Sequence, residues 1–133
     1  LADAGADPSR VVFEITETAA ASQVEAIQAF AQRMHKLGCR VALDDFGVGF
    51  GSLRYLKTLA PHYLKIDMEF VRGLTQSSED ERIVRAIVTM ARGCGMLTVA
   101  EGVEDADTLV ALGAIGVDYA QGFHLGRPAL VES

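Results

Sequence analysis

The stretch that decides the fold reads Val41-Ala42-Leu43-Asp44-Asp45, followed by Phe46-Gly47-Val48-Gly49-Phe50-Gly51. It is a short apolar run that ends in two acids and leads into a glycine-rich loop. Four other runs have the same form and end in an acid or an amide: 11–17, 63–67, 97–101 and 117–121. Runs that are apolar almost throughout suit strands buried on both faces of a parallel sheet.

Helical stretches separate these runs. Segment 24–37 has apolar residues at helical spacing, and Ser22 with Glu25 matches a capping box at its start. The same start signal recurs at Ser78 and predicts a second long helix. Shorter helices are expected over 53–59 and 105–112. Strands that alternate with helices indicate parallel βαβ units.

Two α/β architectures fit this order. A TIM-like (β/α)8 barrel needs about 250 residues, so these 133 residues would be one domain that forms its C-terminal half. A five-stranded doubly wound sheet of the response-regulator receiver type fits the length as a complete domain and also carries aspartates and a lysine at strand ends. The residue order favours the barrel, because Asp44 and Asp45 end the second run and Lys65 lies in the third.

The composition argues against several kinds of partner. A formal net charge of -6 does not favour a DNA or RNA polymer, because lysine and arginine make most phosphate contacts. No apolar run approaches the roughly 20 residues that span a bilayer. We therefore expect no membrane contact from these residues and a cytoplasmic location, with any membrane anchor of the parent protein outside them. Cys39 and Cys94 show no zinc-ligand or disulfide pattern.

Polar side chains stand where the apolar runs end. The carboxyl ends of parallel strands meet at one rim, so we expect these side chains to converge: Glu14, Asp44, Asp45, Lys65, Asp67, Glu101 and Gln121. Like charges brought together destabilise a fold unless something positive lies among them. Ligands that are all oxygen point to Mg²⁺ or Mn²⁺. Two such ions could activate water for in-line phosphodiester cleavage, with Lys65 stabilising the water or the developing charge.

Five ordered motifs also carry a family resemblance. They are Glu14-Ile15-Thr16-Glu17, Asp44 to Leu53, Tyr63-Leu64-Lys65-Ile66-Asp67, Ala100-Glu101-Gly102-Val103-Glu104, and Gln121-Gly122-Phe123 ending near Pro128. Together they resemble EAL domains, which hydrolyse the bacterial messenger cyclic di-GMP to linear pGpG on a TIM-like barrel. The resemblance implies a cyclic-di-GMP-specific phosphodiesterase of bacterial signalling that uses two Mg²⁺ or Mn²⁺ ions.

The resemblance implies a role for each matching residue. Glu14 and Asp44 are similar to ligands of the first metal, and Asp45 and Glu101 to ligands of the second or organisers of its water. Lys65 resembles the lysine that holds the attacking water. Glu17 resembles the glutamate that anchors the loop after Asp45, which the family uses for metal order and dimerisation. The residues expected to contact the substrate are Gln121, Asp67, Phe123 and Pro128. For Asp67 a helix-capping role, and for Phe123 a place in the core, stay open.

The sequence also departs from the family pattern. Val48 and Gly51 replace two hydroxyl-bearing residues of the family loop, and we expect weaker loop ordering or dimer coupling. The signature glutamate and an asparagine ligand would precede Glu14, and the sequence contains no asparagine.

We therefore expect these 133 residues to be inactive alone. The exposed edges of half a barrel should associate as homo-oligomers. The alternative is a degenerate EAL domain that serves as a non-catalytic module for cyclic di-GMP binding or protein interaction.

Overall fold

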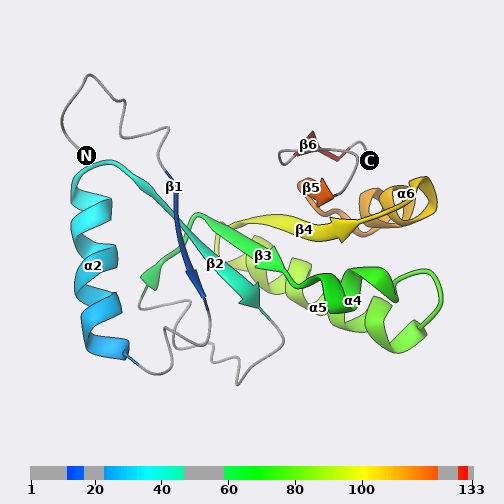
Figure 1. Cartoon of the computed structure of the whole chain (residues 1–133), viewed down its shortest axis with the longest axis horizontal. Coiled ribbons are helices and arrows are strands. Elements are labelled where there is room, and N and C mark those ends of the chain that lie inside the picture. The colour runs from blue at the N-terminus through cyan, green and yellow to red at the C-terminus, as the bar shows by residue number, and fades with distance from the viewer. Residues whose placement is uncertain (1–11, 17–22, 47–58, 123–128, 132–133) are drawn as a thin grey trace. The chain divides into compact units, whose positions relative to one another are not determined.

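The computed structural model describes residues 12–16, 23–46, 59–122 and 129–131. The chain divides into two compact units, Leu1–Tyr63 and Leu64–Ser133. The first contains β1 (Val12–Thr16), α2 (Val24–Lys36) and β2 (Arg40–Phe46). Strand β3 (Tyr63–Ile66) begins at the last residue of this unit. The second unit continues with α4 (Met68–Arg72), α5 (Ser78–Gly93), β4 (Leu97–Val103), α6 (Ala106–Ile115), β5 (Tyr119–Gly122) and β6 (Ala129–Leu130), as labelled in Figure 1.

In the first unit, β1 and β2 pair in parallel, as the sequence predicted. Phe13 lies opposite Val41 and Ile15 opposite Leu43, so these four side chains share one face of the strand pair. Ile15, Val41 and Leu43 are buried, and the Phe13 ring meets the Phe30 ring of α2 edge to face with centroids 5.4 Å apart. The contact between Phe13 and Phe30 shows that this apolar face is the one that α2 covers, and Figure 1 shows the helix beside the two strands.

Helix α2 begins close to its predicted start. Its N-cap is Gln23, which makes no capping bond through its side chain, and Ser22 of the predicted capping box lies outside the described residues. Ala31 and Met34 form the buried stripe of the helix. Behind its end, Gly38 adopts a φ of 81°, a conformation that glycine tolerates better than any other residue.

Two histidines lie together in the first unit. The rings of His35 and His62 have centroids 5.1 Å apart. His35 Nε2 lies 3.0 Å from the carbonyl oxygen of Leu59, and the backbone N–H of Val41 donates to Nδ1 of His62 at 3.1 Å. Nδ1 of His62 must therefore carry no proton, because it accepts this hydrogen bond. Desolvation, helped by repulsion from His35 and Arg40, lowers the pKa of His62 below its ordinary value of 6.5.

This histidine pair predicts a loss of stability in mild acid. Below about pH 6.5 the unfolded chain protonates His62 more readily than the folded chain does. The stabilising contribution is therefore complete above that pH and is lost as the pH falls through the lowered folded-state pKa. Urea unfolding from about pH 8 to about pH 5 should show this loss, and a His62→Asn variant should show a flatter profile. Identical pH profiles for the two proteins would rule the effect out.

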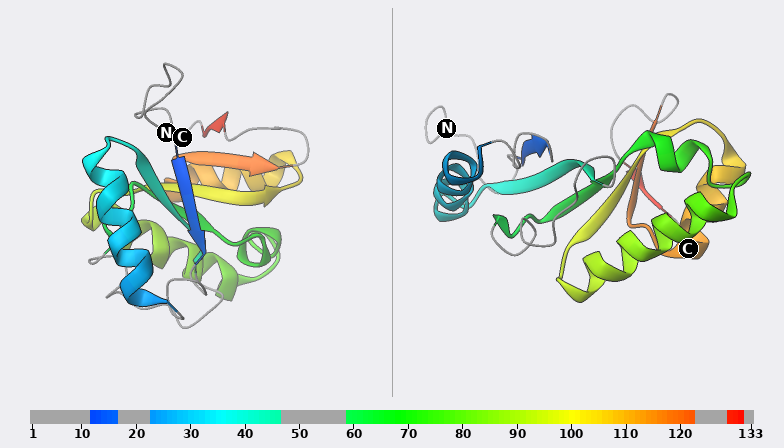
Figure 2. Two further views of the ribbon diagram at one scale, coloured as in Figure 1. Left: turned by 60° about the vertical axis from the view of Figure 1, so that its left-hand side comes forward. Right: turned by 90° about the horizontal axis from the view of Figure 1, so that it is seen from below.

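The second unit has the strand order β3-β4-β5-β6. Strands β4 and β5 are parallel, as predicted, whereas the two-residue β6 pairs antiparallel with β5 and was not predicted. Figure 2 shows β4 and β5 side by side with α5 along β4. Helix α6 extends the predicted segment 105–112 to Ile115, and Asp105 caps it by accepting the Thr108 N–H at 2.7 Å. That bond lowers the pKa of Asp105.

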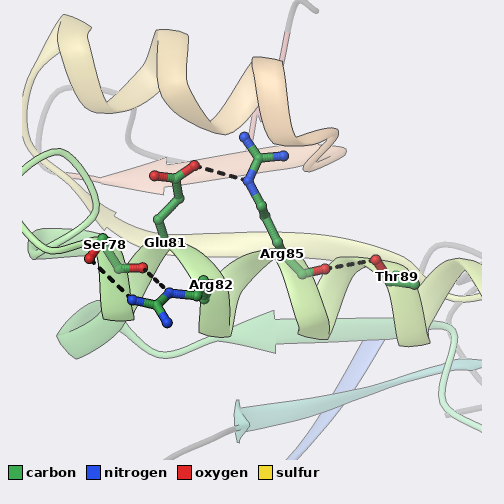
Figure 3. Close-up of polar contacts among 5 residues, drawn as sticks. All are labelled: Ser78, Glu81, Arg82, Arg85 and Thr89. Carbon is green, nitrogen blue, oxygen red and sulfur yellow. Dashed lines mark hydrogen bonds and ion pairs between the residues drawn. The ribbon is translucent and has the colours of Figure 1, made fainter.

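Helix α5 begins one residue earlier than the sequence suggested. Its N-cap is Ser77, whose hydroxyl accepts the Asp80 N–H at 3.2 Å, so the prediction of Ser78 as the start signal was wrong by one residue. Val84, Ile87, Val88 and Ala91 form the buried stripe. Figure 3 shows the exposed face, where Arg85 Nε donates to Glu81 at 2.9 Å and the Thr89 hydroxyl to the Arg85 carbonyl at 2.9 Å.

Two further predictions on helices have different outcomes. The helix predicted over 53–59 lies outside the described residues except at Leu59. Helix α4 was not predicted, and it packs against β4. Among the described residues, no helix combines the length and the apolar character needed to cross a bilayer.

A reciprocal polar contact joins the start of β4 to the residue before β5. Thr98 is 1% exposed, and its N–H and hydroxyl donate to Oδ2 of Asp118 at 2.9 and 3.2 Å. In return the Asp118 N–H donates to the Thr98 hydroxyl at 3.1 Å. The threonine hydroxyl is thus both donor and acceptor in a place that excludes water.

Replacing this hydroxyl should destabilise the fold. Thr98→Val leaves the Asp118 N–H without its acceptor, and a buried polar group that loses its partner costs about 1–3 kcal/mol of unfolding free energy. Thr98→Ser keeps the hydroxyl and is the matched control, because it removes one methyl group only. Equal unfolding free energies for the two variants by urea titration would show that the hydroxyl contributes nothing.

Candidate functional site

Two predicted acids share one face of the strand pair in the first unit. Thr16 lies opposite Asp44, and Glu14 lies two residues before Thr16 on β1. Because side chains alternate along a strand, Glu14 and Asp44 occupy the face opposite to the one that α2 covers. Asp45 is also in β2, but its side chain lies outside the described residues. Glu14 and Asp44 thus lie on one face of the strand pair, and their convergence with the acids of the other strands stays a prediction.

Lys65 is the one charged residue in the buried set of the described chain. It is 9% exposed and belongs to β3. Its Nζ lies 4.0 Å from Oε2 of Glu101 on the neighbouring strand β4, and the two side chains are 11% and 19% exposed. A buried ammonium group needs an opposite charge close by, since desolvation otherwise costs several kcal/mol. Two residues that are 36 positions apart in the sequence thus form one buried ion pair.

A β-bulge displaces the strand next to this pair. Ala100 lies opposite Ala120, but the next register pair is Val103 with Gly122. Two residues of β4, Glu101 and Gly102, therefore face one residue of β5, Gln121. Bulges are uncommon in parallel pairs and are often found next to functional sites, where they change the direction of a side chain.

Gln121 supplies a buried acceptor at this point. Its Oε1 is buried and has no hydrogen-bond partner among the described residues. Such an oxygen costs free energy unless a ligand, water or another part of the chain satisfies it, so the substrate contact expected for Gln121 stays a prediction.

Asp67 has a structural task in addition to its predicted one. It is the N-cap of α4, and its Oδ2 accepts the Glu69 N–H at 2.9 Å. The capping role that the sequence left open is therefore observed, and its predicted contact with substrate stays a prediction. The short helix that Asp67 begins packs along β4.

Several predicted site residues cannot be placed. Glu17, Phe123 and Pro128 lie outside the described residues. Within the part of the chain that the structure describes, no group of three or more histidine, cysteine, aspartate or glutamate residues is arranged to hold a metal ion. The metal-ligand candidates whose side chains are described, Glu14, Asp44 and Glu101, are all carboxylates, the ligand type that suits Mg²⁺ or Mn²⁺.

Two glycines that shape this region were given no role from the sequence. Gly102 and Gly122 stand beside Glu101 and Gln121, at the bulge and at the end of β5. The signal that could have found them is the glycine that directly follows each polar strand end. A glycine inside a strand often marks a bulge or a close backbone approach.

Comparison with known proteins gives a consistent answer. The family model for the EAL domain matches residues 1–128. The cyclic di-GMP phosphodiesterase PdeB of Shewanella oneidensis is 44% identical over 127 residues, which are 95% of this chain and 15% of that protein.

Two solved structures are also similar. The EAL domain of Mycobacterium smegmatis DcpA is 39% identical with a TM-score of 0.84, over 95% of this chain and 56% of that one. Klebsiella pneumoniae BlrP1, in a manganese and cyclic di-GMP complex, is 32% identical with a TM-score of 0.86, over 95% of this chain and 32% of that one.

These matches decide between the two architectures. The solved relatives are EAL domains, which confirms the predicted α/β fold class of parallel βα repeats of a TIM-like barrel and removes the receiver alternative. The chain spans about a sixth of the length of the curated relative and about a third to a half of the solved ones.

The buried ion pair predicts a measurable coupling. In a double-mutant cycle, Lys65→Met and Glu101→Gln should each destabilise the protein, because each removes the opposite charge from a buried group. Together they should cost less than their sum, with a coupling of about 1–3 kcal/mol in urea unfolding.

A second pair in the chain provides the control. Arg72 and Glu104 are closer, at 3.3 Å, but their side chains are 58% and 61% exposed. The cycle Arg72→Met with Glu104→Gln should give less than about 1 kcal/mol. A coupling for Lys65 and Glu101 no larger than this control would contradict the assignment.

Proposed function

The chain belongs to the EAL domain family, and on that premise we propose that its domain hydrolyses cyclic di-GMP to linear pGpG with the help of divalent metal ions. Named relatives of the chain are cyclic di-GMP phosphodiesterases. The observation that carries the proposal is the buried pair of Lys65 and Glu101, at 4.0 Å, beside the bulge opposite Gln121. A charged pair held in a buried place is expensive to maintain, and functional sites are where such groups are usual.

The proposed metal ligands are the predicted acids Glu14, Asp44, Asp45 and Glu101. Mg²⁺ and Mn²⁺ both prefer carboxylate oxygens, and the manganese complex of BlrP1 shows that a relative accepts such an ion. When bound, two ions would supply positive charge for the phosphate and activate the water. Glu14 and Asp44, on the same face of adjacent strands, both offer carboxylate oxygens.

Lys65 acts on the attacking water in this proposal. In the reaction the water oxygen bonds to phosphorus, the bond from phosphorus to the 3′ oxygen of one ribose breaks, and a proton ends on that 3′ oxygen. An ammonium group has three donors and no acceptor. Lys65 can therefore hold the water by its oxygen and stabilise the negative charge that grows on the phosphoryl oxygens. The ion pair with Glu101 holds the ammonium group of Lys65 between β3 and β4.

Substrate contacts are proposed for four residues. The Oε1 atom of Gln121 is suited to accept a hydrogen bond from the ligand, because it has no donor among the described residues. Asp67 would use the carboxylate oxygen that is not committed to capping α4. Phe123 and Pro128 follow from the resemblance to the family. Glu17 is proposed to anchor the loop after Asp45 on the same basis.

The location, the oligomeric state and the partners of the domain are proposed on the same basis. We propose a cytoplasmic homo-oligomer in bacterial signalling whose ligand is the cyclic dinucleotide and no DNA or RNA polymer. The net charge of -6 supports the last point. We also propose that the 133 residues do not turn over cyclic di-GMP alone, because the asparagine ligand that the family uses is absent from this sequence.

One observation favours a second function. Val48 and Gly51 lack the hydroxyl groups of the family loop, so the domain would be a module that binds cyclic di-GMP or a protein partner without hydrolysis. Binding without turnover separates this function from the enzyme.

The test is turnover by a protein that carries the complete domain. With Mn²⁺ it should convert cyclic di-GMP to linear pGpG, measured by chromatography, and a chelator should stop the reaction. Asp44→Asn should lower kcat by about 100-fold or more, because electrostatic groups at reacting centres contribute that much.

The matched control is Asp107→Asn, the same change on an exposed residue in the first turn of α6. It should keep its activity. Tight binding of cyclic di-GMP without product would establish the non-catalytic function, and an active Asp44→Asn protein would remove the metal role of Asp44.

A further inference from the structure

The bulge in β4 lets the side chain of Glu101 point in a different direction from the buried side chains on either side of it, Ala100 and Val103. Ala100 is fully buried and Val103 is 5% exposed, and both are register partners of β5. In a regular strand, residues 101 and 103 would share a face, because the side-chain period is two. The extra residue at the bulge lets Val103 return to the buried face while Glu101 is directed toward Lys65.

Gly102 is the residue that makes this bulge possible. Its φ is +73°, in the left-handed region that side-chain-bearing residues rarely adopt. A Cβ atom placed there would lie 2.5 Å from the Cβ of Met68, the first residue of α4. A side chain at this position would therefore strain the bulge and push α4 away from β4. The same helix carries Asp67 as its cap.

Gly122 of β5 lies close to the backbone of β4. A Cβ atom at Gly122 would collide with the backbone carbonyl of Val103, its register partner on β4. Backbone atoms cannot move aside as the end of a flexible side chain can. Glycine at position 122 therefore lets β5 approach β4 just beyond Gln121, and glycine at position 102 lets α4 approach β4 just beyond Glu101.

We propose that Gly102 and Gly122 are positioning residues for the phosphodiesterase reaction. They hold Glu101 against Lys65 and fix Gln121 opposite the bulge, while Gly102 also admits the Asp67 end of α4 to β4. This inference rests on the proposed function for its kinetic consequence, but its geometric part concerns the contact between Lys65 and Glu101 alone. Neither glycine touches the substrate in this scheme.

A pair of glycine variants tests the proposal. Gly95 has nearly the same backbone conformation as Gly102, with a φ of +75°, but a Cβ atom there meets nothing within 4 Å. Gly95→Ala therefore measures backbone strain alone. Gly102→Ala should lower kcat by about 100-fold, the loss expected from a displacement of roughly 1 Å at a reacting centre, with KM changed by less than about threefold. Gly95→Ala should keep kcat within about threefold of the unsubstituted protein.

A spectroscopic readout separates this proposal from the proposed function. In a protein labelled with ¹³C at lysine, the Lys65 ε-methylene resonance should move in Gly102→Ala in the same direction as in Glu101→Gln. It should not move in Gly95→Ala. This measurement needs neither metal nor turnover, so it reads the positioning role even in a protein that does not hydrolyse cyclic di-GMP.

Rescue provides the second variant. Met68→Gly removes the Cβ atom that the new methyl group would meet, so Gly102→Ala with Met68→Gly should recover part of the lost kcat and of the Lys65 resonance position. The double variant is also measured if Gly102→Ala does not fold by circular dichroism. A Gly102→Ala protein with the kcat and Lys65 resonance of Gly95→Ala would overturn the proposal, and so would a double variant without any recovery.

Discussion

Burial of the Lys65 ammonium group is the constraint on which the polar residues at the strand ends of the second unit depend. A buried charge is tolerated only with an opposite charge and further polar contacts nearby, and here the carboxylate of Glu101 lies 4.0 Å away. Lys65 belongs to β3 and Glu101 to the neighbouring strand β4, so the ion pair joins two adjacent strands. The cost of burying most of this pair is understandable if the pair acts on a ligand, because charges with little water around them interact more strongly than charges in bulk water.

The glycines near this pair connect local backbone conformation to chemistry. Gly102 accepts a positive φ that other residues resist, Glu101 gains its direction from the resulting bulge, and α4 can pack along β4. Asp67 caps the N-terminus of that helix by accepting a backbone hydrogen bond. One small residue therefore influences two elements of secondary structure, β4 and α4. Thr98 and Asp118 secure the other end of β4 by reciprocal hydrogen bonds.

The strands and long helices were predictable because their signals are local and repeated. The five apolar runs became β1 to β5, and the periodic segments became α2, α5 and α6. Helix α4 was missed because five residues are too few to show a helical period, and β6 because two residues carry no strand pattern. The bulge was missed since the φ of Gly102 depends on the partner strand. The sequence predicted that Lys65 and Glu101 converge with the other polar strand ends, but the ion pair between these two residues was not predicted.

In the proposed function, acids at the strand ends bind divalent ions close to a buried lysine. The most direct measurement is the anomalous scattering of manganese in crystals of a protein that carries the complete domain, grown with Mn²⁺ and cyclic di-GMP. We expect manganese in direct coordination with the carboxylates of Asp44 and Glu101, and the ammonium group of Lys65 facing the phosphate of the dinucleotide. Manganese bound elsewhere, with both carboxylates outside its coordination shell, would contradict it.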